Sequence, residues 1–83
     1  MRPQLLVRYW AGARAAAGLS QEYVTLPGDA DVADAVAVLA DQHPGREPIL
    51  EGASLLLDGR SARREEPVGA AETLEVLPPF AGG

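Results

Sequence analysis

The feature that most constrains the fold is one amphipathic helix pattern over residues 31–43, flanked on both sides by strand-like segments. Its apolar positions recur at intervals of three and four residues, at Val32, Ala35, Val36 and Leu39. Asp31 suits the N-cap of this helix, and Asp34 lies beside the unpaired N–H groups of its first turn. Because a single helix buries only one stripe, it must cover one face of a sheet, which predicts an α+β layer pair.

Alternating apolar residues predict two strands before this helix, over residues 4–11 and 20–26. A short alanine-rich helix of one or two turns is expected between them, over residues 12–18, closed by Gly18. In the first strand Arg8 belongs on the solvent side, and the period of two puts Trp10 on the same side.

After the helix the pattern changes to loop and strand. Residues 45–52 are interpreted as a loop with a short apolar pair. A strand is predicted over residues 55–57, and Asp58-Gly59 is a strong hairpin signal that returns the chain through residues 60–63. The last strand is predicted over residues 73–77.

Composition excludes several classes of function. The 83 residues suffice for one small domain. There is no Cys, which removes disulfides, cysteine-based zinc sites and a cysteine nucleophile. The net charge of −5 argues against nucleic acid as a partner, and suits either a basic partner surface or plain solubility. No apolar run of about 18 residues and no secretory segment is visible, so we expect a cytoplasmic protein without membrane contact.

The side chains show no catalytic or metal-binding constellation. His43 is the single histidine, and at the end of a helix it is interpreted as a surface residue or one that satisfies the helix dipole. Ser54 weakly resembles the phosphopantetheine serine of acyl carrier proteins, but it precedes a strand-like run. Arg60, Arg63 and Arg64 form a basic cluster, which is either a solvated hairpin or a contact for an acidic partner.

The end of the chain carries the most specific pattern. Pro78 and Pro79 end the last strand because each lacks the N–H that a sheet ladder needs. Phe80 and Ala81 follow, and then Gly82-Gly83. Without Cβ atoms, these glycines suit a segment that threads a narrow channel. The alternatives are a frayed terminus or an expression scar.

Residues 77–83 resemble the terminal signature of the MoaD/ThiS sulfur carriers, and the Pro-Pro-x-x-Gly-Gly form is closer to MoaD. Residues 7–18 also resemble the opening strand and short helix of that family. The resemblance implies a ubiquitin-like β-grasp fold: a mixed sheet of four to five strands on one main helix, with the first and last strands parallel at its centre. Residues 1–77 would form this domain and residues 78–83 a flexible tail.

The resemblance also implies a chemistry centred on Gly83. Its carboxylate would be adenylated by an E1-like enzyme of the MoeB or ThiF type, and then converted to a thiocarboxylate. ATP would be used by that partner, with no cofactor bound here. The segment that would thread the partner's active site consists of Pro78, Pro79, Phe80, Ala81 and Gly82. The chain would not catalyse alone but would act as the sulfur-donor subunit or co-substrate of a synthase.

Several functions remain open at this point. The preferred one is the small subunit of molybdopterin synthase, with a sulfur-accepting subunit of the MoaE type as partner. The alternatives are a sulfur carrier for thiamine, cysteine or another sulfur metabolite, a ubiquitin-like protein modifier acting through Gly83, and an interaction domain with an idle tail. With no Lys, the chain cannot build Lys-linked chains on itself.

Three residues are expected to dock the partner. Trp10 and Leu77 should lie on the sheet face away from the helix, forming one exposed apolar patch beside the tail if the first and last strands are neighbours. The alternative is a Trp10 that folds over a nearby loop. Arg60, on the hairpin, is the third docking residue.

Overall fold

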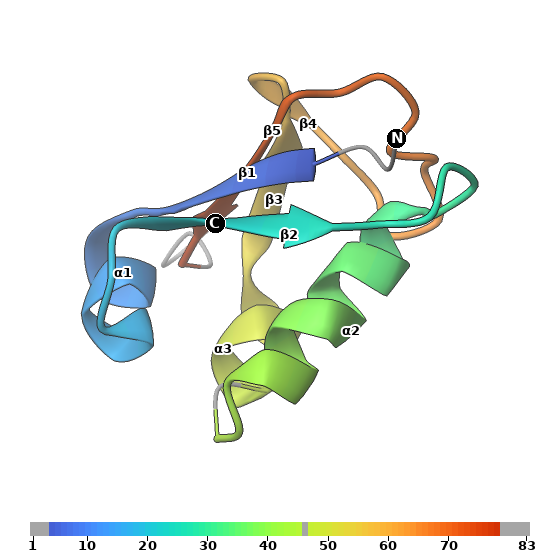
Figure 1. Ribbon diagram of the computed structural model, residues 1–83. Helices are drawn as coiled ribbons and strands as arrows, with labels where there is room; N and C mark the ends of the chain where they lie inside the picture. Colours follow the sequence, from blue (N-terminus) through green and yellow to red (C-terminus); the bar gives the residue numbers. More distant parts are fainter. Residues whose placement is uncertain (1–3, 46, 79–83) are drawn as a thin grey trace.

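The computed structural model describes residues 4–45 and 47–78, which form a five-stranded sheet with helices on one of its faces (Figure 1). The elements in chain order are β1 (Gln4–Tyr9), α1 (Ala11–Ala17), β2 (Gln21–Thr25), α2 (Val32–Gln42), α3 (Glu47–Gly52), β3 (Ser54–Leu57), β4 (Arg60–Ser61) and β5 (Thr73–Leu77). In this part of the chain no helix is long and apolar enough to cross a membrane.

The two ends of the domain meet at the centre of the sheet. The strand order is β2-β1-β5-β3-β4, and β1 runs parallel to β5 with Val7 opposite Leu74. All other neighbours are antiparallel. The parallel central pair that the family resemblance implied is therefore confirmed.

One face of the sheet carries the core. β1 and β5 each alternate between buried and more exposed residues, as the period of a half-buried strand requires. The largest fully buried side chains come from the strands and from α2 and α3; they are Leu5, Leu39, Leu50, Leu57, Leu74, Val7, Val24, Val32 and Val76. Burying each of them contributes about 1.5–3 kcal/mol before the entropy cost is counted.

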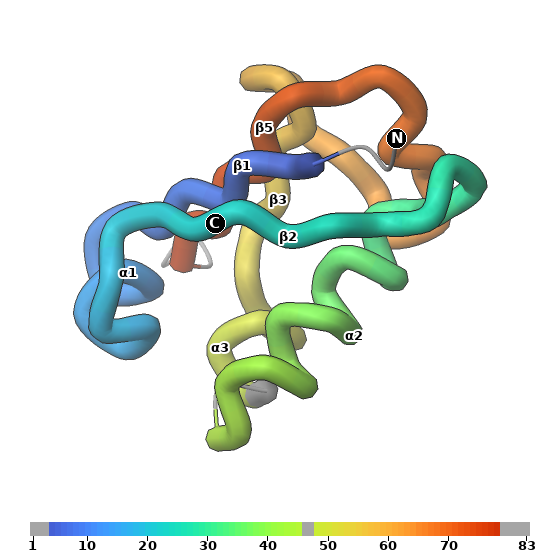
Figure 2. Tube along the Cα trace, viewed as in Figure 1, coloured from blue at the N-terminus to red at the C-terminus, as the bar shows by residue number. Residues whose placement is uncertain are grey.

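Helix α2 begins at the predicted N-cap. The Asp34 N–H donates to Asp31 Oδ1 at 2.8 Å, and the Asp31 N–H donates to Asp34 Oδ2 at 2.9 Å. The two side chains thus satisfy two backbone donors reciprocally, as in a capping box. The connection between β4 and β5 passes this end of the helix, where the Val32 N–H donates to the Glu66 carbonyl at 2.9 Å (Figure 2).

The structure corrects three of the predicted boundaries. Residues 45–52 are not all loop, because α3 forms there; six residues are too few for a clear period, and the helix is stabilised by burying Leu50. The first strand ends at Tyr9, since Ala11 has a positive φ of 51° that no strand accommodates. β4 stops at Ser61 and does not continue to residue 63.

Asp58 joins the β3–β4 hairpin to the start of β5. Its Oδ1 accepts hydrogen bonds from the Glu72 N–H and the Thr73 N–H, both at 3.0 Å, and from Thr73 Oγ1 at 3.2 Å. The bonds from the Thr73 and Glu72 backbone hold the pKa of this carboxyl below its usual value.

Replacing Asp31 by alanine should lower the free energy of unfolding by about 1 kcal/mol, the usual cost of losing an N-cap. Denaturant melts of the purified protein measure this value. Asp29→Ala, an exposed aspartate just before the helix, is the matched control and should leave the stability nearly unchanged. Equal losses in both variants would show that the capping box does not stabilise α2.

Replacing Asp58 by asparagine should make the stability of the protein fall less steeply as the pH is lowered into the acid range. A lowered pKa in the folded state adds stability above the unfolded pKa of about 3.9, and this stability is lost as the pH falls through the folded value. Melting temperatures of both proteins between pH 7 and pH 2 test this. Two curves that stay parallel below pH 4 would contradict the role given to Asp58.

Candidate functional site

The root of the tail lies at the middle of the sheet. β5 is the central strand beside β1 and ends at Leu77; Pro78 follows and is half-buried. The predicted threading residues Pro79, Phe80, Ala81 and Gly82, and the reactive Gly83, lie outside the described residues. The chain therefore leaves the domain beside the first turn of α1, where the Trp10 N–H donates to the Val76 carbonyl at 3.0 Å.

Trp10 has the outward orientation that strand alternation predicted. Its side chain is among the exposed large hydrophobic groups, with 40% of the residue accessible. The Arg8 guanidinium carbon lies 4.9 Å from the centroid of the indole, which is within range of a cation–π interaction. Because both residues lie on the outer side, Arg8 covers part of the indole while leaving the rest open to a partner.

Leu77 is the neighbour of Trp10 across the central strand pair. Tyr9 lies opposite Val76 in the parallel register, and the next residue on each side is Trp10 and Leu77. Leu77 is half-buried. The structure therefore brings these two predicted docking residues together at the point where the tail begins.

Tyr23 was not predicted as a functional residue. It is 63% exposed and lies opposite Leu6 in the β1–β2 ladder. An aromatic ring this open on a sheet is a usual component of a binding surface. With Leu6, Trp10 and Leu77 it defines what we call the outer face of the sheet.

Arg60 does not belong to this apolar group. It lies opposite Leu57, whereas Leu77 lies opposite Ser54 at the other end of the same strand. Its guanidinium forms an ion pair with Glu66. This contact raises the pKa of Arg60 and lowers the pKa of the Glu66 carboxyl, chiefly through the hydrogen bond between them.

The basic cluster predicted from the sequence is divided in the structure. The side chain of Arg63 is 89% exposed and has a 3.8 Å contact with Glu65, whose side chain is 79% exposed. Arg64 Nη2 donates to the carbonyls of Leu50 and Glu51 at 2.8 and 2.9 Å, so it closes the end of α3. Each of the three arginines thus has a different environment.

His43 lies at the C-cap of α2, where its half-buried side chain is bonded to the sheet. Its Nε2 lies 2.8 Å from Glu22 Oε1, and the Tyr9 hydroxyl donates to Glu22 Oε2 at 2.7 Å. The three side chains tie the end of α2 to the sheet.

Among residues 4–45 and 47–78 no group of three or more potential metal ligands exists. Ser54 opens a strand, in agreement with setting the acyl-carrier interpretation aside.

The mixed sheet with a parallel central pair and one main helix across it defines the class of protein, the ubiquitin-like β-grasp fold. The ThiS family model matches residues 7–83, and the chain belongs to the ThiS family. No curated protein matched its sequence.

Solved structures agree with this assignment. SAMP1 from Haloferax volcanii is 27% identical with a TM-score of 0.84, over 98% of this chain and 100% of its own. A putative molybdopterin converting factor subunit 1 from Pyrococcus furiosus is 24% identical with a TM-score of 0.77, over 93% and 98% of the two chains. A chain from the complex of subunits 1 and 2 of molybdopterin-converting factor from Helicobacter pylori is 15% identical with a TM-score of 0.66, over 98% and 100%.

Replacing Trp10 by alanine should weaken the affinity for an activating or sulfur-accepting partner by about 2 kcal/mol, the scale of an interface hot spot. The stability should fall much less than the roughly 3–5 kcal/mol of a buried tryptophan, because 40% of the residue is accessible. Titration calorimetry and denaturant melts give the two values. A large loss of stability with unchanged affinity would make Trp10 a core residue and refute its docking role.

Proposed function

We propose that this protein is a sulfur carrier whose Gly83 carboxylate is adenylated and then converted to a thiocarboxylate. The observation that carries the proposal is the ThiS family match, which extends through Gly82-Gly83. The fold supports it, because the central strand ends at Leu77, one residue before the tail begins. The described residues also offer exposed aromatic side chains, Trp10 and Tyr23, to a partner.

The chemistry requires activation because a carboxylate has no leaving group. A Gly83 carboxylate oxygen attacks the α-phosphorus of ATP, forming an acyl-adenylate and releasing pyrophosphate. A sulfide sulfur from the donor system then attacks the carbonyl carbon, and the acyl–oxygen bond breaks to release AMP. The product is a thiocarboxylate, which is ionised at neutral pH and is a stronger nucleophile than the carboxylate. All ATP binding belongs to the E1-like partner, of the MoeB or ThiF type.

The composition suits this chemistry. Without Cys, the chain cannot carry sulfur as a persulfide, so the terminal carbonyl is the position left for it. Gly82 and Gly83 let the end pass a narrow channel to the phosphates of ATP, where a side chain would clash. Because activation consumes ATP, we also place the reaction in the cytoplasm.

We favour the small subunit of molybdopterin synthase as the specific role, with thiocarboxylate sulfur passing to a large subunit of the MoaE type. The similarity to a putative molybdopterin converting factor subunit 1, and to a chain from a complex of subunits 1 and 2, supports this choice. A carrier that supplies sulfur for thiamine, cysteine or another metabolite uses the same activation and differs only in the final acceptor.

The second candidate function is protein modification through an isopeptide at Gly83. It is favoured by the 27% identity to a Haloferax volcanii structure described as small archaeal modifier protein 1. The two functions separate at the acyl-adenylate, which is captured by sulfur in one case and by a lysine amine of a target in the other. Amide adducts without any thiocarboxylate would favour the modifier.

Incubation with the cognate adenylating enzyme, ATP and a sulfur donor should replace one oxygen of the chain by sulfur. Intact-mass spectrometry detects this change, and fragmentation should assign it to Gly83. An unchanged mass, in a reaction where the enzyme hydrolyses ATP, would contradict the carrier function.

A free Gly83 should be required for this reaction. Deleting Gly83, or extending the chain with a C-terminal tag, should abolish thiocarboxylate formation and leave the melting temperature nearly unchanged, because the buried core residues that the structure describes all precede Pro78. A tag on the N-terminus is the matched control and should have no effect. A C-terminally tagged protein that still reacts would refute the mechanism.

A further inference from the structure

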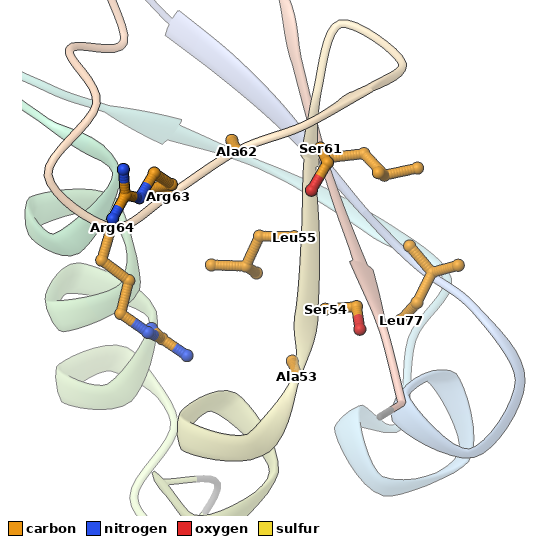
Figure 3. Close-up of a pocket in the computed structure, with 9 residues that line it drawn as sticks. Ala53, Ser54, Leu55, Ser61, Ala62, Arg63, Arg64 and Leu77 are labelled. Carbon is orange, nitrogen blue, oxygen red and sulfur yellow. The ribbon is translucent and has the colours of Figure 1, made fainter. Parts of the chain in front are cut away.

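A groove runs along the end of the sheet opposite to β2. It has a volume of about 510 Å³ and lies between β3, the turn into β3 and the chain that returns from β4. Figure 3 shows Leu55 on the same side of β3 as the arginines, and Ser54 and Leu77 on the other side. The groove therefore wraps around the edge of a strand and contacts both of its faces.

This edge of β3 is only partly covered. β4 has two residues and pairs with Leu56 and Leu57 alone. Beyond them, the Ala62 N–H donates to the Leu55 carbonyl at 2.9 Å, and no backbone bond to the Leu55 N–H is formed within the described ranges. A short edge strand limits unwanted pairing. Here it also leaves the Leu55 N–H available to a carbonyl of another extended segment, whereas the Leu55 carbonyl and the Ala53 N–H are already bonded.

The charges at the groove favour a negatively charged ligand. Arg63 extends into solvent with a loose 3.8 Å contact to Glu65, and Arg64 bonds to carbonyls, which do not neutralise its charge. The neighbouring Arg60 differs, because Glu66 neutralises it. On a chain with a net charge of −5, the groove thus carries two cations without a tight carboxylate partner among the residues described.

We propose that this groove binds an extended, acidic peptide segment of a partner protein, which pairs with the open edge of β3 and places a carboxylate against Arg63. Alternate side chains of the segment would rest on Ala53, Leu55 and Ala62. Because Leu77 also lines the groove, a segment bound there lies directly beside the root of the tail. That the segment belongs to the partner that activates or uses Gly83 rests on the proposed function.

A peptide experiment tests the groove without depending on that function. The probe is a capped peptide of about seven residues that alternates threonine and glutamate, the length of an ordinary strand. Added to isotopically labelled protein, it should shift the amide signals of residues 53–56 and 62–64. A peptide with lysine in place of glutamate should not shift them.

The variant Arg63→Glu should weaken this binding about tenfold, the loss expected for one charge-assisted hydrogen bond. Arg14→Glu makes the same charge change on exposed α1 and is the matched control. Equal binding of the two peptides, no shifts at millimolar peptide, or no effect of Arg63→Glu would each overturn the proposal. So would peptide binding that becomes much tighter when residues 78–83 are deleted, since the protein's own tail would then be the occupant.

With the adenylating enzyme, Arg63→Glu should raise the KM for the carrier about tenfold with kcat unchanged. Melting temperatures verify that both variants are folded. If the wild type is never activated, the proposed function fails while the peptide result still decides the groove. If the wild type is activated and Arg63→Glu matches it in both assays, only the groove proposal fails.

Discussion

The parallel pairing of β1 with β5 is the constraint on which the rest of the structure depends. It places the first and last strands side by side at the centre of the sheet, where each is supported by neighbours on both sides. Both strands then supply fully buried residues, such as Val7 and Leu74, to one core. Because Leu77 ends a central strand, the fold fixes its position relative to Trp10.

The division of the sheet into two faces follows from this pairing. The inner face is closed by α2, whose capping box and buried Leu39 hold it in place. The outer face keeps Trp10 and Tyr23 open, and the tail begins between this face and the groove at β3. Under the proposed function, the domain contributes recognition, and the reactive atoms belong to Gly83 and to the enzyme that activates it.

Much of the fold followed from the sequence, because its signals are local. The cap at Asp31, the turn at Asp58-Gly59 and the alternation around Arg8 each depend on neighbouring residues, and the structure confirms them. Helix α3 was missed, since its stability comes from packing Leu50 into a core assembled from distant segments. The parallel central pair came from the family resemblance, because no local pattern encodes the partner of a strand.

Only part of the candidate site could be predicted, again because the signals in the sequence are local. Strand period was enough to place Trp10 and Leu77 on one side, and the register then made them neighbours. The His43–Glu22 contact and the separate environments of Arg60, Arg63 and Arg64 arise from residues distant in sequence, which a linear pattern does not join.

The most direct test of the central claim is to trap the acyl-adenylate with hydroxylamine and locate the hydroxamate by fragmentation. The account predicts an ATP-dependent hydroxamate at Gly83 alone; a hydroxamate on an aspartate or glutamate side chain, or none, would contradict it.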